Sequence, residues 1–210
     1  MYVGRIVAVG CTKSGKGAGL YRVSSRSFPN REAKLLGKAV AIVPKPGFEN
    51  DIFKNPYIAY NCYRQVGDLA VVTNGSHTDP IAEKLESGMN IRDALASVML
   101  AMDYEHDSLD TPRISGVVRA DGSEGWLAIV RKDALLVRKM ELVPGKAFFI
   151  CTYELNRPCG KQVEDNFTAE TAAAACSFIM GQGVFADLEK PVAAVCAVAK
   201  AGGGFDLAAV

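Results

Sequence analysis

The β-type segments of this chain follow one another in runs, and this order constrains the fold more than any single motif does. Apolar stretches typical of strands occupy residues 2–10 and 19–24, and the turn TKSGKG joins them. The Asp-Gly step in ADGSEG at 120–125 is a hairpin signal. Strands that follow one another without intervening helices predict antiparallel sheets. Further β-type segments lie at 37–44, 57–65, 68–73, 114–120, 125–131, 135–142 and 146–155, and in VAAVCAVA and FDLAAV on either side of AGGG.

Helical patterns are confined to two blocks of the chain. A short helix begins at Asp79-Pro80, because proline is tolerated in a first turn. Asn90 caps a longer one over NIRDALASVMLAMDYE, whose apolar residues share one face. A third helix runs from about residue 168 to 181 through an alanine-rich stretch. This arrangement predicts an α+β protein with helices packed outside antiparallel sheets.

The length and the charge narrow the possible functions. The 210 residues suffice for one domain covering 1–210, and no linker, repeat or low-complexity segment divides them. With 49% hydrophobic and 22% charged residues, the composition is that of a globular protein. A formal net charge of +1 provides no overall field to attract nucleic acid or a membrane surface. Any recognition of an anion must therefore be local.

The cysteines and the N-terminus predict a cytoplasmic location. The six cysteines are scattered, with neither the spacing of a metal finger nor the density of a disulfide framework, and they read as reduced thiols. The opening MYVGRIVAVG lacks the basic head and apolar run of a signal peptide. No stretch reaches the roughly 18 apolar residues that a membrane helix needs.

The segment YRVSSRSFPNR, residues 21–31, is rich in groups that bind anions. In an extended strand Arg22, Ser24 and Arg26 project to one face, where their guanidinium and hydroxyl groups match a phosphate. An exposed edge strand with solvated arginines is the alternative. Arg31, beyond the Phe28-Pro29 break, is expected to be a solvated surface charge.

Two further segments combine aromatic and polar side chains. In NPYIAYNCYR, Tyr57 and Tyr60 around Asn61 suit a heterocyclic base, although tyrosines at strand ends often only pack in the core. In TNGSHTDP, Asn74-Gly75 predicts a tight turn, and the helix that follows offers free N–H groups to an anion. His77 there is a helix-cap residue or, alternatively, a proton shuttle.

The segment AMDYEHDSLDTPRI places acidic side chains at the end of the long helix. Acids there oppose the helix dipole, so their presence calls for a reason. Catalysis, pairing with Arg113 or with the arginines of YRVSSRSFPNR, and metal binding are the three candidates. The spacing of a calcium loop is missing, which makes metal binding the weakest of them.

Together the four polar segments closely resemble matching stretches of the archaeal-type IMP cyclohydrolase family, and MYVGRIVAVG resembles its first strand. The likeness covers about the first 115 residues; beyond them it rests on length and on the order of strands and helices. The resemblance implies a four-layer αββα sandwich of two mainly antiparallel sheets between helix layers, as in N-terminal-nucleophile hydrolases. It implies ring closure of the formylated aminoimidazole carboxamide ribonucleotide to inosine monophosphate, with loss of water.

The resemblance also implies which partners and residues take part. We expect a purine nucleotide substrate, a homo-oligomer, no metal and no cofactor. Positioning is the largest part of such a reaction, because nucleophile and electrophile belong to one molecule. The expected catalytic residues are Tyr57, Tyr60, Asn61, Tyr104 and Glu105, with Tyr104 and Glu105 transferring protons, and the expected substrate-binding residues are Arg22, Ser24, Arg26, Asn30, Asn74 and Arg113.

Two other functions stay open on the sequence alone. An N-terminal-nucleophile amidase needs Cys, Ser or Thr as its first residue, and the chain begins Met1-Tyr2. A cut between Gly10 and Cys11 would create one, but it would remove the first predicted strand. A nucleotide-binding module without activity is the third possibility.

Overall fold

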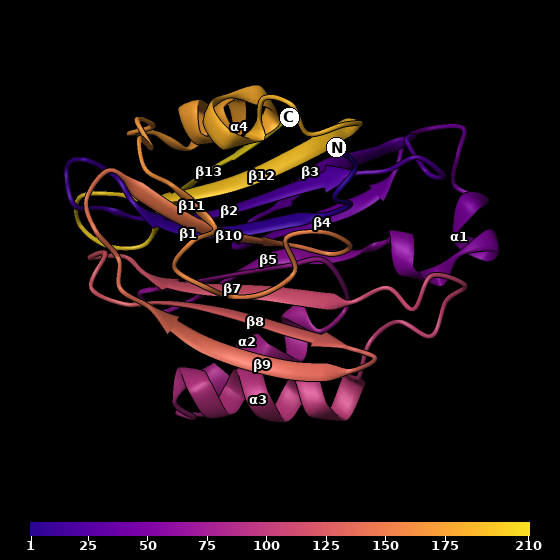
Figure 1. Cartoon of the computed structure of the whole chain (residues 1–210), viewed down its shortest axis with the longest axis horizontal. Coiled ribbons are helices and arrows are strands. Elements are labelled where there is room, and N and C mark those ends of the chain that lie inside the picture. The colour runs from indigo at the N-terminus through magenta and orange to yellow at the C-terminus, as the bar shows by residue number, and fades with distance from the viewer.

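The computed structural model describes residues 1–210, and its strands form two antiparallel sheets that face each other (Figure 1). Sheet 1 contains, in spatial order, β11 (Val163–Glu164), β10 (Lys146–Cys151), β1 (Ile6–Cys11), β2 (Gly17–Ser24), β12 (Pro191–Ala199) and β13 (Phe205–Ala209). Sheet 2 contains β3 (Arg31–Leu36), β4 (Ala39–Pro44), β5 (Tyr60–Val66), β6 (Leu69–Thr73), β7 (Arg113–Arg119), β8 (Gly125–Arg131) and β9 (Ala134–Met140).

Helices cover the outer faces of both sheets. Helix α4 (Ala172–Gly181) lies on sheet 1, whereas α2 (Thr78–Glu86) and α3 (Ile91–Met102) lie on sheet 2 (Figure 1). The predicted four-layer αββα sandwich is therefore confirmed. None of the helices combines the length and apolar character that a membrane crossing requires. Three short elements complete the fold: α1 (Asp51–Lys54) and the single-turn 3₁₀ helices η1 (Pro56–Ile58) and η2 (Gly183–Phe185).

The alternation of side chains along β1 shows how the layers are built. Val7 and Val9 point into the core between the two sheets, while Ile6 and Ala8 pack in the second core beneath α4. The sheets approach closely at Gly116, where an added Cβ would lie 2.8 Å from a methyl of Val7. A strand with apolar residues on both faces has to lie inside the sandwich, and β1 is paired on both sides, with β10 and β2.

The Asn90 cap that predicted the start of the long helix is confirmed. The Asn90 side chain accepts a hydrogen bond from the backbone N–H of Asp93, at 3.0 Å, and α3 begins at the next residue. Helix α4 begins later than predicted, because the Thr171 side chain caps it by accepting from the Ala174 N–H. Helix α2 spans Thr78–Glu86, close to the predicted segment.

Strand β3 was not predicted from the sequence. Its residues REAKLL lack apolar alternation, because β3 is an edge strand whose second half is exposed to solvent. The Phe28-Pro29 break lies between β2 and β3, which belong to different sheets. The segment from Ser25 to Asn30 therefore carries the chain from one sheet to the other at one end of the sandwich.

Candidate active site

A small pocket lies at the end of the sandwich where Figure 1 shows the N-terminus and α1. Its volume is about 130 Å³. Segments from five parts of the chain meet there: the residues before β1, the crossing between the sheets, the turn around η1, the loop after α3 and the end of β10. The lining residues are Tyr2, Arg5, Ser25, Ser27, Phe28, Arg31, Asn55, Tyr57, Ile58, Glu105, Asp107, Ser108, Leu109 and Tyr153.

Glu105 is the buried acid of this pocket. Its side chain is 1% exposed, with Arg5 Nη2 3.4 Å from Oε2 and Arg113 Nη1 3.6 Å from Oε1. Oε1 itself has no hydrogen-bond partner. Burial raises the pKa of Glu105 to about 7, because the cost of desolvating its carboxylate outweighs the attraction of Arg5 and Arg113. A carboxyl group with this pKa can donate or accept a proton near neutral pH.

The loop after α3 turns Glu105 toward the pocket. Helix α3 stops at Asp103, whose φ of 53° breaks the helix. The Asp107 carboxylate then accepts from the backbone N–H groups of Leu109 and Thr111 and from the Thr111 hydroxyl. The backbone N–H of Glu105 donates to the Thr111 carbonyl at 2.8 Å. Part of the acidic cluster therefore folds the loop that presents Glu105.

Arg31 is buried in the pocket wall, so the expectation of a solvated surface charge was wrong. It is 3% exposed, and its Nε donates to the Phe28 carbonyl at 3.1 Å. The position explains the burial: Arg31 is the first residue of β3, directly after the crossing between the sheets. Arg5 also lines the pocket and was missed, although an arginine at the start of an apolar strand is a signal that could have been weighed.

Two predicted tyrosines lie in or beneath the pocket. Tyr57 lines it, with the Arg113 guanidinium 5.7 Å from the centre of the Tyr57 ring. Tyr60 lies deeper, where its hydroxyl is 2.6 Å from that of Tyr21. Burial raises the pKa of Tyr60, against the opposing effect of Arg31 and Arg5, so its phenol is neutral at physiological pH.

Three predicted residues make their contacts elsewhere. The Asn61 amide donates to the Asp79 carboxylate, at 3.0 and 3.1 Å, on the side of sheet 2 that faces α2. Tyr104 packs against the His106 ring, with centroids 4.4 Å apart. The Asn74 side chain forms hydrogen bonds with the backbone of Pro112 and Ile114, on either side of Arg113. None of the three lines the pocket.

The Arg22 and Ser24 side chains do share one face, as the strand alternation predicts, but that face points to α4. Arg22 is fully buried, and Nη1 donates to the carbonyls of Ile179 and Phe185 at 3.1 and 3.3 Å. Its Nε donates to the Ser24 hydroxyl at 3.1 Å. These contacts tie the end of α4 and the residues after it to β2. The structure thus places both residues away from the pocket.

Arg26 and Asn30 lie beyond the end of β2. Arg26 is exposed at the outer rim, where it pairs with Glu189 at 3.0 Å and lies 4.2 Å from the centre of the Tyr2 ring. A second hollow, of about 280 Å³, joins this rim to the pocket through shared lining residues. The Asn30 carbonyl accepts from the Lys45 N–H, and this bond steadies the crossing segment.

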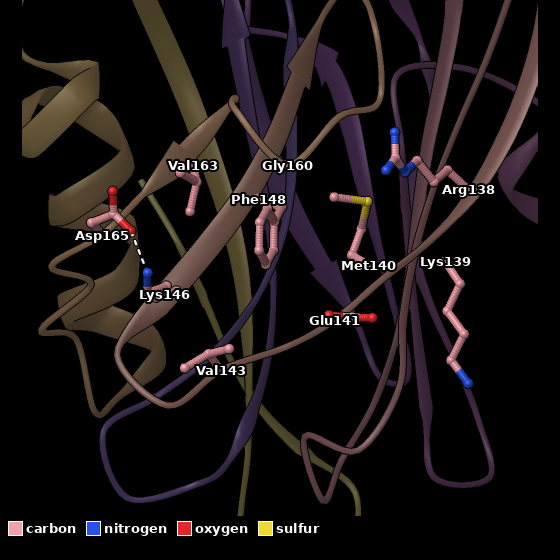
Figure 2. Close-up of a pocket in the computed structure, with 10 residues that line it drawn as sticks. All are labelled: Arg138, Lys139, Met140, Glu141, Val143, Lys146, Phe148, Gly160, Val163 and Asp165. Carbon is pink, nitrogen blue, oxygen red and sulfur yellow. Dashed lines mark ion pairs between the residues drawn. The ribbon is translucent and has the colours of Figure 1, made fainter.

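The largest cavity of the molecule, of about 520 Å³, lies elsewhere, between β9 and β10 (Figure 2). Lys146 at its edge is 2.6 Å from Asp165, and Lys139 pairs with Glu124 at 3.6 Å. Its charged side chains are thus partly neutralised, and none of them is a buried acid. Since the smaller pocket holds the carboxyl with the raised pKa, we place the candidate active site there.

Cys11 has no role in this pocket. It is the last residue of β1, is buried, and lies in a strand that is paired on both sides. A cut before Cys11 would remove most of an interior strand, which makes processing at this position structurally unfavourable.

A pocket that surrounds one buried carboxyl group with arginines and tyrosines is suited to acid–base chemistry on an anionic ligand. The chain belongs to the IMP cyclohydrolase-like protein family, whose model matches residues 2–203. A protein of Methanosphaera stadtmanae named IMP cyclohydrolase is 47% identical over 200 residues, which is 95% of each chain. Proteins of the same name are 44% identical in Methanococcus maripaludis, over all of both chains, and 46% identical in Methanocaldococcus jannaschii, over 95% of this chain and 93% of the relative.

Proposed function

We propose that this protein is an IMP cyclohydrolase and that the pocket around Glu105 is its active site. The reaction closes the purine ring of 5-formamidoimidazole-4-carboxamide ribonucleotide, gives inosine monophosphate and releases water. Membership of the family and the names of the relatives support the activity. The observation that supports the location is the buried carboxyl of Glu105, whose pKa is raised to about 7.

The chemistry needs a proton acceptor and a group that stabilises negative charge. The carboxamide nitrogen attacks the formyl carbon, so that a C–N bond forms and the formyl oxygen gains negative charge. The carboxamide nitrogen and the former formamido nitrogen each lose one proton, and both protons leave with the oxygen as water when the C–O bond breaks and the ring C=N bond forms. Glu105 accepts a proton from nitrogen and passes it to the departing oxygen. With a pKa near the working pH, the carboxyl group can do both.

The arginines provide the positive charge. Arg5 and Arg113 flank Glu105, and Arg31 lines the same pocket, so these guanidinium groups can bind a phosphate or a developing oxyanion. Tyr57 offers a flat face to the imidazole ring, and Arg26 stands at the rim toward which a ribose phosphate can extend. Tyr60 supports the pocket from below.

The contacts of the remaining predicted residues support roles in the fold. Asn61, Asn74, Arg22 and Ser24 form hydrogen bonds with other protein groups, and Tyr104 packs against the His106 ring. We therefore leave them out of the proposed active site. Asn30 contacts Lys45 through its backbone carbonyl, so we leave it out as well.

Incubation with the formylated ribonucleotide, followed by the absorbance change as the ring closes, tests the proposal. We expect turnover without added metal and in the presence of chelator. Glu105→Gln should lower kcat by about 10²–10⁴-fold, the range of general acid–base catalysis. Glu83→Gln, a matched change on the exposed face of α2, is the control. Tight nucleotide binding by the wild type without any turnover would instead favour the non-catalytic nucleotide-binding module.

The same proposal extends to the setting of the enzyme. All six cysteines are free thiols, which supports a reducing compartment, the cytoplasm. We propose a homo-oligomer, and light scattering of the purified protein tests this by its mass relative to the 22.4 kDa chain. An intact mass that corresponds to a start at Met1 or Tyr2 is expected for the cyclohydrolase, and a mass matching a start at Cys11 would favour the amidase.

A further inference from the structure

The turn from Asn74 to His77 holds the backbone on both sides of Arg113. The Asn74 amide donates to the Pro112 carbonyl at 3.0 Å and accepts from the Ile114 N–H at 2.7 Å. His77 Nε2 lies 3.1 Å from the Ile114 carbonyl. Arg113 thus begins β7 between two residues that this turn fixes in place.

These contacts determine which nitrogen of His77 carries the proton. A carbonyl oxygen only accepts, so Nε2 is the donor, and Nδ1 is left with a lone pair. His77 is fully buried, and burial together with Arg113 lowers its pKa to about 3. The ring is therefore neutral at physiological pH, and Nδ1 is a buried acceptor without a partner.

A matching donor lies across Gly75. Arg113 Nη1 is also buried without a hydrogen-bond partner. A Cβ built on Gly75 would lie 2.9 Å from Arg113 Nη1 and 3.2 Å from His77 Nδ1, so both atoms border the same point. The absence of a side chain at Gly75 leaves the space between them open. An unpaired donor and an unpaired acceptor on either side of one gap can be joined directly or by one water.

We propose that His77 is a positioning residue whose Nδ1 lone pair orients the Arg113 guanidinium toward Glu105. The same atom, Arg113 Nη1, lies 3.6 Å from Glu105 Oε1, so a shift of this nitrogen changes both contacts. The Arg113 Nε donates to the Asp103 carbonyl at 2.8 Å and fixes the other side of the guanidinium. The inference rests on the proposed function, because it gives His77 a part in the proton transfer by Glu105.

The charges around Glu105 determine the direction of the effect. Arg5 acts on it from the residue before β1, Arg113 from β7 and Arg31 from β3, and Asp107 acts on it from its own loop. The three arginines favour the carboxylate, and Asp107 opposes it. If Arg113 turns away, Glu105 loses part of the attraction, and its pKa rises.

Two substitutions by amide side chains distinguish the role of Nε2 of His77 from that of Nδ1. Glutamine reaches the position of Nε2, so His77→Gln can keep the bond to the Ile114 carbonyl but loses the acceptor toward Arg113. Asparagine reaches the position of Nδ1, so His77→Asn can keep that acceptor but loses the bond to Ile114. A role confined to the fold predicts that the two variants differ only in stability.

The midpoint of the Glu105 carboxyl titration, followed by ¹³C NMR and identified by its loss in Glu105→Gln, is the primary measurement. It does not depend on turnover, so it stands even if the cyclohydrolase assay fails. We expect His77→Gln to raise the midpoint by about 0.5–1 pH unit, since one unit corresponds to the full loss of a modest charge interaction. His77→Asn should stay closer to the wild-type midpoint than His77→Gln does. In the ring-closure assay, kcat of His77→Gln should fall by about tenfold or more, the range for a lost hydrogen bond to a charged group.

Gly75→Ala provides an independent variant with the same readout. Gly75 does not have a positive φ, so the backbone tolerates alanine, and the added methyl meets the movable end of Arg113. It should also raise the midpoint. Ser76→Ala, an exposed change in the same turn, is the matched control. Unchanged midpoints in folded His77→Gln and Gly75→Ala would overturn the proposal, and if His77→Gln does not fold, Gly75→Ala alone decides.

Discussion

Arg5 Nη2 lies 3.4 Å from Glu105 Oε2, although the two residues are 100 positions apart in the chain. Arg5 directly precedes the interior strand β1 of sheet 1, and Glu105 follows α3, which covers sheet 2. The pair therefore spans the two halves of the sandwich at the end where the chain crosses between them. The distance between Nη2 and Oε2 is long for an ion pair, which is consistent with a carboxyl group whose uncharged form is favoured by burial.

The titration of Glu105 should make the free energy of unfolding depend on pH, and this dependence should be absent in Glu105→Gln. The pKa of Glu105 is about 7 in the folded state, against a usual value of 4.5. Between these values the unfolded chain has lost a proton that the folded chain keeps, so this carboxyl lowers the free energy of unfolding as pH rises.

The measurement is urea unfolding of wild type and Glu105→Gln from pH 4 to 8. The stability of the wild type relative to the variant should fall across this window by on the order of 3 kcal/mol, at 1.36 kcal/mol per unit of pKa shift. The two proteins are compared because His77 also makes stability depend on pH. Its pKa is lowered to about 3, so it lowers the free energy of unfolding of both proteins as pH falls below 6.5. A constant difference would show that Glu105 titrates normally.

Arg31 should contribute more than Arg26 to the binding of the substrate phosphate. Arg31 is buried in the pocket wall, whereas Arg26 is 58% exposed and already paired with Glu189. A guanidinium–phosphate contact away from water is worth about 1.5–3 kcal/mol, and an exposed pair about 0.2–1 kcal/mol. Calorimetric titration with inosine monophosphate and inosine compares the variants. Arg31→Ala should weaken the nucleotide more than the nucleoside, and equal losses for both ligands would assign Arg31 to the fold.

Arg22 should control stability and leave ligand preference unchanged. Its guanidinium donates to carbonyls at the end of α4 and in the residues that follow. Arg22→Ala would leave buried carbonyls unsatisfied and should cost about 1–3 kcal/mol for each carbonyl that water does not reach. Chemical denaturation measures the loss, and Arg157→Ala at an exposed position serves as control. A folded Arg22→Ala with normal stability but weak nucleotide binding would restore the phosphate role that the sequence suggested.

The sequence predicted the layers well because strand and helix signals are local. Continuous apolar stretches identify β1 and β2, and the Asn90 cap marks the start of α3 to the residue. The position of Arg31 was not predictable in this way. Its burial results from the crossing between the sheets, a tertiary event that brings β3 beside the loop containing Glu105. The alternation that correctly placed Arg22 and Ser24 on one face could not show that this face meets α4.

The hydroxyl pair of Tyr21 and Tyr60 should behave as one buried unit. The two oxygens are 2.6 Å apart in the core between the sheets, and each phenol is neutral because burial raises its pKa. Changing either residue to Phe leaves the other hydroxyl without a hydrogen-bond partner and should lower the free energy of unfolding by about 1–3 kcal/mol. Changing both removes the unsatisfied hydroxyl, so the double variant should lose less than the sum of the two single losses. Urea unfolding of the four proteins of the cycle measures the coupling. Additive losses of stability would show that the two hydroxyls do not depend on each other. Nucleotide binding by the same four proteins would then test whether Tyr60 supports the pocket through Arg5 and Arg31 instead.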